Sequence, residues 1–435
     1  MAARAAQDPL RDAEQLDGAL GRLAVATWPM ATASGGVGGN VRPDRATAAR
    51  AGPTDCGAAP LRPRGEDAAA GRPRGRSSWS AATRLTERTT GPPATAGQLV
   101  RVHQAAARFF RGQLRASWAP GYLSNRGFDA VTQNRWLAGY APAGGAALTR
   151  HLRAHGYADA VIEAAGLARR SRRGALVDTF RDRAMLPIRD SDGAIVAFIG
   201  RAPDRARPSV PKYLNSPRTV LYSKREVLFG LWEARGLFAD GARPVLVEGP
   251  LDVIAVTAAG SDRFAGVAPC GTALTGEHVA ALGRLCDLQA TGVIVAFDPD
   301  QAGRKAAVAA YHLLSSVTGG VAWASAVSGQ DPADLLRDEG PAALADVLAE
   351  RTCPLADLVV DAQVDGWRRW LCYPEGQFNA LRAAAPVIAA MPPGHVARQV
   401  ARLSGRLGLD HPTVTEAVTD ALTGLVTCPN PVRPG

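Results

Sequence analysis

Two stretches decide the fold: Val245-Leu246-Val247-Glu248-Gly249-Pro250-Leu251-Asp252 and Val293-Ile294-Val295-Ala296-Phe297-Asp298-Pro299-Asp300. Each is a short apolar run that ends in carboxylates. Uninterrupted apolar runs of this length are typical of strands buried on both faces of a sheet. The pattern continues on both sides, with strands expected at Val245–Val247, Phe264–Ala268, Val293–Phe297 and Val321–Ala324, and helices at Leu251–Ala259, Gly276–Leu285 and Ala302–Leu314. Strands joined by helical crossovers predict a parallel sheet with helices on both faces, so residues 241–345 are expected to form an α/β domain.

The segment before this domain combines helices with a hairpin. Apolar residues from Leu99 to Leu114 recur at helical spacing, and the runs Met185–Ile188 and Ile195–Ile199 flank a polar turn. Further helices are expected at Ala146–His155, at Ala158–Ala165 and near Lys224–Ala234. Residues 96–240 are therefore predicted to be an α+β subdomain. The mostly helical pattern from Gly340 to Gly424 predicts a helical region at 346–435 that ends in a tail.

The composition favours a polyanionic partner. The chain has 435 residues, with 50 Lys and Arg against 40 Asp and Glu and a net charge of +10. A basic chain of this kind suits nucleic acid. Residues 1–95 are rich in Ala, Gly, Pro and Arg and cannot bury enough apolar surface to fold, so we expect a disordered tail there.

Cysteine spacing and hydropathy exclude two other classes of protein. The six cysteines include no Cys-x-x-Cys pair and no Cys/His cluster, which argues against a zinc site and favours free thiols in a reducing compartment. No apolar stretch approaches the ~20 residues that are needed to cross a bilayer. The sequence therefore predicts a soluble, cytoplasmic protein without a membrane segment.

Carboxylates follow three of the predicted strands, at the edge where ligands bind in open parallel sheets. Glu248 follows the first strand and Asp252 begins the next helix. Asp298 and Asp300 follow the third strand, and Asp331 and Asp334 follow the fourth. Two carboxylates ~4 Å apart repel by roughly 4 kcal/mol at an effective dielectric of ~20, so a proton or a cation must relieve them. Oxygen ligands without His or Cys select Mg²⁺ or Mn²⁺, which points to phosphoryl or nucleotidyl transfer. Taken singly, each Asp is also explained as a helix cap.

Four motifs of the α/β segment together resemble the Toprim domain, in the version found in DnaG-type bacterial primases. They are Val247-Glu248-Gly249-Pro250-Leu251-Asp252, Pro269-Cys270-Gly271-Thr272-Ala273, Phe297-Asp298-Pro299-Asp300-Gln301-Ala302-Gly303-Arg304 and Gly329-Gln330-Asp331-Pro332. Upstream motifs resemble the amino-terminal half of the catalytic core of those primases: Tyr122-Leu123 with Arg126-Gly127, Gly139-Tyr140-Ala141-Pro142, Arg181-Asp182-Arg183-Ala184-Met185-Leu186-Pro187-Ile188-Arg189-Asp190, Phe198-Ile199-Gly200-Arg201 and Pro211-Lys212-Tyr213-Leu214-Asn215-Ser216-Pro217. The resemblance covers residues 98–345.

The resemblance implies a polymerase that starts RNA chains on single-stranded DNA from ribonucleotide triphosphates. By position, Glu248 would handle the 3′-hydroxyl or a metal ion, and Asp252 would support the site. The divalent ions would be held by Asp298, Asp300 and Asp331. The resemblance also implies a basic ridge that grips the template strand or the triphosphate, formed by Arg201, Lys212, Tyr213, Asn215 and Lys224.

Three features depart from the family's pattern. Residues 1–95 contain Cys56 as their single cysteine and no histidine, whereas family members begin with a Cys/His zinc ribbon. Residues 346–435 leave little room for the usual helicase-binding domain, so a replicative helicase would act in trans. No P-loop motif occurs. The sequence thus predicts a bare catalytic core, a nucleotidyltransferase that uses Mg²⁺ or Mn²⁺ and has no zinc site.

Two other interpretations stay open. A Toprim nuclease could use the same acids, whereas a topoisomerase needs a tyrosine nucleophile on a separate domain, and none is evident. A non-catalytic nucleic-acid-binding relative of the primases would keep the fold and lose the chemistry. Nicking of labelled DNA without triphosphates would identify a nuclease. Unchanged binding and biological effect in the variants Glu248→Gln and Asp298→Asn would identify a binding protein.

Overall fold

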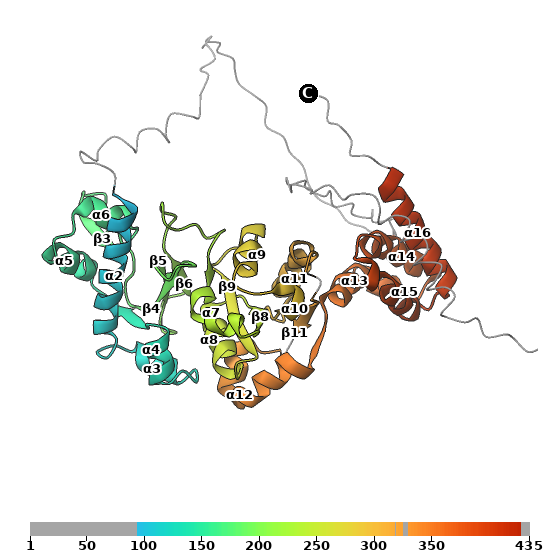
Figure 1. Cartoon of the computed structure of the whole chain (residues 1–435), viewed down its shortest axis with the longest axis horizontal. Coiled ribbons are helices and arrows are strands. Elements are labelled where there is room, and N and C mark those ends of the chain that lie inside the picture. The colour runs from blue at the N-terminus through green and yellow to red at the C-terminus, as the bar shows by residue number, and fades with distance from the viewer. Residues whose placement is uncertain (1–93, 318, 325–328, 428–435) are drawn as a thin grey trace, which may run out of the picture. The chain divides into compact units, whose positions relative to one another are not determined.

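The computed structural model describes residues 94–317, 319–324 and 329–427, and a six-stranded sheet forms the centre of their α/β region (Figure 1). The strand order is β12-β11-β10-β8-β9-β7. The strands are β7 (Leu228–Phe229), β8 (Arg243–Leu246), β9 (Phe264–Pro269), β10 (Val293–Val295), β11 (Val321–Ala324) and β12 (Thr352–Pro354). The four inner strands are parallel, which confirms the predicted sheet, while the edge strands β7 and β12 are antiparallel. The two edge strands were not predicted, because such short strands leave no periodic pattern in a sequence.

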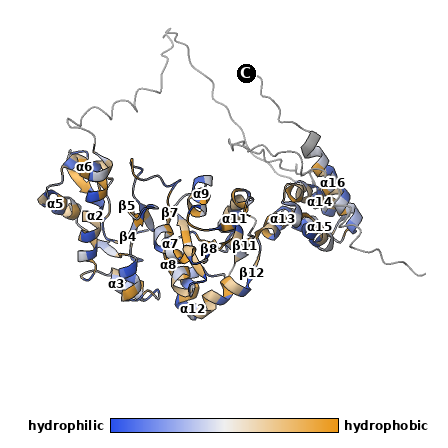
Figure 2. Ribbon diagram, in the orientation of Figure 1, coloured by the Kyte–Doolittle hydropathy of each residue, from blue (hydrophilic) through white to orange (hydrophobic). Residues whose placement is uncertain are grey.

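Helices follow the strands of this sheet at their carboxyl-terminal ends, except for the short helix Leu288–Thr291, which directly precedes β10. They are α8 (Pro250–Ala259), α9 (Gly276–Gly283), α10 (Leu288–Thr291), α11 (Gln301–Leu314) and α12 (Pro332–Glu350). Nearly all of α8 is buried against β9 and α12, in keeping with its hydrophobic colouring in Figure 2. Asp300 caps the amino terminus of α11 and Asp331 caps that of α12. The residues that follow the strands therefore also start the helices.

A second sheet, of four antiparallel strands, precedes the α/β region. It has the order β1-β4-β5-β6, with β1 (Gly139–Ala141), β4 (Arg183–Arg189), β5 (Ile195–Arg201) and β6 (Tyr213–Asn215). Strands β4 and β5 are the predicted hairpin. Helix α2 (Ala96–Gln113) packs against β1 and β5 and buries the predicted apolar stripe, including Leu99, Val102 and Phe110. The remaining elements are α3 (Ala119–Ser124), α4 (Ala130–Arg135), α5 (Ala147–Ala154), α6 (Asp159–Ala164), β2 (Ala168–Arg170) and β3 (Leu176–Asp178).

One helix prediction was wrong in position. The helix expected near Lys224–Ala234 is α7, which begins at Leu231 and ends at Ala239. The residues before it form β7, because Leu228 and Phe229 pair with the edge of β9. This pairing is a tertiary contact, and it overrides the local helical pattern. Strand β7 thus lies in the segment assigned to the amino-terminal subdomain but belongs to the α/β sheet, and the domain boundaries remain a prediction.

The carboxy-terminal part is helical, as expected. Its elements are α13 (Leu355–Asp365), η2 (Arg368–Trp370), α14 (Pro374–Ala389), α15 (Pro393–Leu407) and α16 (His411–Thr427). Helices α13 and α15 are joined by a ladder of ion pairs between aspartates of the first and arginines of the second. Within the described ranges, no helix combines the length and apolar character of a membrane span. The predictions for 1–93, which include Cys56, and for the tail at 428–435 lie outside the described residues.

Candidate active site

The carboxylates that follow β8 and β10 lie together at the edge of the sheet. The backbone N–H of Asp298 donates to Glu248 Oε1 at 3.2 Å. Partial desolvation, and then the charge of Asp298, raise the pKa of Glu248. Desolvation, followed by Asp331 and Asp300, raises the pKa of Asp298. The structure therefore brings the predicted acids of two neighbouring strands into one repelling cluster.

The amino terminus of α11 is packed directly against this cluster. Asp300 accepts a hydrogen bond from the N–H of Gly303 at 2.8 Å, so the third acid caps the helix. A Cβ atom at Gly303 would lie 2.1 Å from the carbonyl oxygen of Asp298 and 2.8 Å from Glu248 Oε1. Only glycine fits this close approach. The helix end thereby fixes the backbone that carries Asp298 and Asp300.

Asp252 connects two helix starts beneath the cluster. It is 7% exposed, and its carboxyl oxygens accept the N–H groups of Gly249 and Ala333, each at 3.1 Å. Burial, and then the charge of Asp331, raise the pKa of Asp252 to about 8. Asp331 itself caps α12, so Asp252 ties the start of α8 to the start of the helix that Asp331 begins. These contacts suit the supporting role that the sequence predicts for Asp252.

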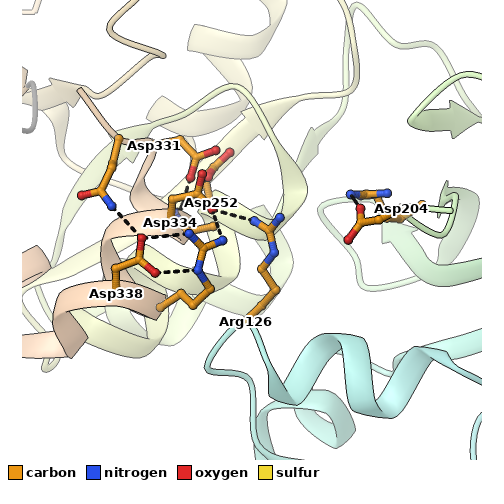
Figure 3. Close-up of polar contacts among 10 residues, drawn as sticks. Arg126, Asp204, Asp252, Asp331, Asp334 and Asp338 are labelled. Atoms are coloured by element: carbon orange, nitrogen blue, oxygen red, sulfur yellow. Dashed lines mark hydrogen bonds and ion pairs between the residues drawn. The ribbon is translucent and has the colours of Figure 1, made fainter. Parts of the chain in front are cut away.

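An arginine of the amino-terminal part reaches the same edge. Arg126 Nη1 lies 2.9 Å from Asp334 Oδ1, across 208 residues of sequence. Asp334 also accepts a hydrogen bond from Arg337 Nη1 at 2.6 Å. Figure 3 shows Asp252, Asp331 and Asp334 beside the guanidinium of Arg126, and Asp204 set apart from them. The sequence placed Asp334 among the carboxylates that follow the fourth strand, whereas Arg126 was singled out only within a motif that carries the resemblance.

Arg201 and Tyr213 form a layer of rings and cations on the second sheet. The guanidinium of Arg201 lies 5.0 Å from the ring centre of Tyr122 and 5.7 Å from that of Tyr213. Its side chain is 7% exposed and is paired with Asp204 at 2.6 Å. Lys212 is exposed, lies 5.8 Å from the ring of Tyr213, and opposes the rise in the pKa of Asp298. Lys212 is thus the member of the predicted ridge whose charge reaches the acids.

The last two ridge residues line a separate groove. Lys224 and Asn215 border a groove of about 750 Å³ whose other cationic residues are Arg169, Arg181 and Arg183. The Asn215 amide donates to the carbonyl of Cys270 at 2.9 Å, and its buried oxygen has no hydrogen-bond partner in the described structure. The sequence singled out Arg181 and Arg183 only within a motif and did not single out Arg169. Its lining carries four cationic side chains against one acid, Glu163, and so suits a polyanion.

The donor set at the sheet edge fits a hard divalent cation. Among the described residues, no three His, Cys, Asp or Glu side chains converge closely enough to hold an ion in the arrangement seen. Glu248 and Asp298 are nonetheless adjacent, and the acids that raise their pKa values are carboxylates, which are the ligands that Mg²⁺ and Mn²⁺ prefer. Burial, and then the charges of neighbouring carboxylates, raise the pKa values of both groups, so a bound cation would relieve this cluster. The described cysteines, Cys270, Cys286, Cys353 and Cys372, are free thiols.

Comparison with known families identifies both halves of this arrangement. Residues 109–235 match the family described as DNA primase catalytic core, N-terminal domain. Residues 245–336 match the family described as Toprim-like. The two matches together cover the antiparallel sheet and the acidic edge of the parallel sheet.

Individual proteins give the same result. A DNA primase of Streptomyces coelicolor is 38% identical over 318 residues, which are 72% of this chain and 48% of that protein. The RNA polymerase domain of Mycobacterium tuberculosis primase DnaG, solved with double-stranded DNA, is 36% identical with a TM-score of 0.62, over 73% of this chain and 99% of that one. A DnaG primase catalytic domain bound to single-stranded DNA is 29% identical with a TM-score of 0.61, over 73% and 98% of the two chains. The chain thus spans about half the length of the curated relatives that it matches.

Proposed function

The chain belongs to the DnaG family of bacterial DNA primases, and we propose that it synthesises short RNA primers on single-stranded DNA from ribonucleoside triphosphates. The observation that carries the proposal is the contact between Glu248 and the backbone of Asp298, which unites the acids of two strands. An exposed lysine, Lys212, lies close enough to influence the charge of Asp298. Acids facing a cation in this way suit a reaction between a hydroxyl group and a triphosphate.

In the reaction proposed, the 3′-hydroxyl of the growing chain attacks the α-phosphate of the incoming triphosphate, and pyrophosphate leaves. Glu248, Asp298, Asp300 and Asp331 would hold Mg²⁺ or Mn²⁺, with Asp252 fixing the helix starts behind them. When bound, the divalent ions stabilise the charge on the attacking and departing oxygens. If Glu248 instead stays free of the metal ions, its raised pKa suits it to accept the proton of the 3′-hydroxyl.

The residues of the predicted ridge are assigned to different parts of the substrates. Lys212 is exposed beside the acids, so we assign it to the triphosphate. Lys224 and Asn215 border the arginine-lined groove, so we assign them to the template strand, whose phosphates the groove would neutralise. Arg201 is buried between two tyrosine rings and paired with Asp204. We therefore assign Arg201 to the positioning of Tyr213, and we assign the stacking of a base to Tyr213.

Primer synthesis by the purified full-length chain tests the proposal. The assay supplies single-stranded DNA and ribonucleotides with Mg²⁺ or Mn²⁺, and its controls omit the metal or the triphosphates. We expect product only in the complete mixtures, and none from Glu248→Gln. No product in any complete mixture, under conditions where the relative from Mycobacterium tuberculosis is active, would falsify the proposal. Nicking of labelled DNA without triphosphates would show instead that the chain is a nuclease.

A further inference from the structure

The exposed aromatic side chains of the described structure gather in one place. Trp370, Tyr373 and Phe378 are 59%, 55% and 45% exposed, and every other described Phe, Trp and Tyr is at least half-buried. All three lie between the end of η2 and the second turn of α14. Large exposed rings in one short segment that no other described residue covers mark an interaction surface.

The segment that carries the rings is held rigidly. The N–H of Tyr373 donates to the carbonyl of Trp370 at 3.0 Å, and the Gln377 amide donates to the carbonyl of Leu371 at 3.1 Å. A Cβ atom at Gly376 would lie 1.9 Å from the Trp370 carbonyl oxygen, so α14 starts in direct contact with the turn. The ring centres of Trp370 and Tyr373 are 6.4 Å apart. The backbone that carries the two rings is therefore held in place by contacts within the segment.

Positive charge exceeds negative charge in the segment that carries the rings. Arg368, Arg369 and Arg382 are exposed and form no ion pair within the described structure. Arg382 follows Phe378 by one helical turn, so both lie on the same face of α14. The arginines of the neighbouring helix α15, in contrast, are bound to aspartates of α13. Glu375 is the acid within this segment, so the cations outnumber it.

We infer that this aromatic–arginine patch, Arg368, Arg369, Trp370, Tyr373, Phe378 and Arg382, binds single-stranded nucleic acid. Bases stack on the faces of Trp370 and Tyr373, while Arg368 and Arg369 meet the phosphates. Exposed π-faces and unpaired guanidinium groups together match an unstacked polyanion, since a duplex would offer the rings no free bases. The inference rests on the proposed function in one respect, because it takes the template strand as the ligand.

Binding of a fluorescein-labelled oligo(dT) to the full-length chain tests the stacking. We expect the double variant Trp370→Ala/Tyr373→Ala to raise Kd roughly tenfold or more, because each stacked base contributes to affinity. The variant Trp370→Phe/Tyr373→Phe keeps the ring faces and should stay within about twofold of the wild type. The same comparison is repeated with Arg181→Gln/Lys224→Gln, which weakens the other groove. Unchanged affinity of the alanine variant in both backgrounds overturns the inference and leaves the patch to a protein partner.

Salt dependence tests the phosphate contacts. Arg368→Gln/Arg369→Gln should lower the slope of log K against log salt by about 1.4, the value for two contacts on a single strand. The control is Arg284→Gln/Arg351→Gln, which removes the same charge from two other exposed positions. Equal slopes in the two variants would show a general charge effect and reject the contacts at 368 and 369.

Primer synthesis separates this inference from the proposed function. The patch variants should raise the KM for template and keep kcat, whereas Glu248→Gln should lose kcat and keep oligo(dT) affinity. Suppose that the wild type makes no primer and that the alanine variant binds oligo(dT) more weakly than the wild type. The proposed function then fails, and the inference about the patch stands. If the wild type makes primers and the alanine variant binds normally, the patch fails alone.

Discussion

The carboxylates beyond β8 and β10 and those along α13 have the same chemistry but different partners. On α13, Asp357 accepts hydrogen bonds from Arg398 and Gln399, which outweigh its burial and lower its pKa. At the sheet edge, Glu248 and Asp298 form no ion pair within the described structure, and their pKa values are raised. The chain has 50 basic residues, so a shortage of cations does not explain the difference. A cluster left unpaired in a basic protein points to a cation or a substrate that arrives from solution.

The largest expected effect comes from neutralising the unpaired acids. Glu248→Gln and Asp298→Asn should each lower the rate of primer synthesis by roughly 10³-fold, the equivalent of about 4 kcal/mol of charge stabilisation. The thermal midpoint should stay the same or rise, because each change removes repulsion from the folded state. Glu339→Gln, an exposed acid without an ion pair on α12, is the matched control and should keep full activity. A loss of stability together with activity would make the acids structural.

The pH dependence of stability should have opposite signs in the two regions. With chelator present, the raised pKa of Asp252, about 8, means that the folded state holds its proton more tightly than the unfolded state does. The contribution of Asp252 to the free energy of unfolding is therefore present at low pH and is lost as pH rises towards 8. The loss is at most about 3 kcal/mol over two pH units. The lowered pKa of Asp357 makes its contribution present at neutral pH and lost in acid, as pH falls below about 4.

Urea unfolding between pH 5 and 8.5 measures the first of these slopes. Asp252→Asn should flatten the decline in unfolding free energy, and Asp357→Asn should leave it in place. An equal slope in wild type and Asp252→Asn would show that another group carries the proton.

These two regions also differ in how far the sequence reveals them. An apolar run that ends in an acid is a local pattern, so Glu248 and Asp298 were placed at their strand ends without the structure. The pairing of Arg126 with Asp334 spans 208 residues, and no local pattern reports it. The strand β7 was not predicted for the same reason, because it pairs with β9, which is distant in the sequence. Contacts within one element are readable from spacing, and contacts between elements need the fold.

The ladder of ion pairs between α13 and α15 could be predicted from the sequence in part. Asp357, Asp361 and Asp365 recur at four-residue spacing on α13, and Arg398, Arg402 and Arg406 recur likewise on α15. That spacing puts each set on one helix face and was available as a signal for two facing helices. The spacing does not say which two helices face each other; in the structure α13 and α15 do, and each buries apolar residues such as Val360 and Val400.

The buried end of the ladder should carry a moderate share of stability. Asp357→Ala removes the acceptor for Arg398 and leaves the buried amide of Gln399 without its partner. We expect the free energy of unfolding to fall by about 2 kcal/mol, the usual cost of an unsatisfied buried polar group together with a lost charged hydrogen bond. The kcat of primer synthesis should not change. Urea unfolding and the primer assay on the same preparation measure both, and a fall in kcat without a fall in stability would contradict the division between the regions.

The exposed end of the ladder should carry almost nothing. The side chain of Asp365 is 51% exposed, and its partner Arg406 also pairs with Asp361, so Asp365→Asn leaves that guanidinium with a carboxylate. Asp365 also ends α13, where a negative charge opposes the helix dipole, and its removal offsets part of the lost attraction. The free energy of unfolding should change by less than about 0.5 kcal/mol. A cost as large as that of Asp357→Ala would mean that ion pairing itself, and not the burial of its acceptor, separates the two regions.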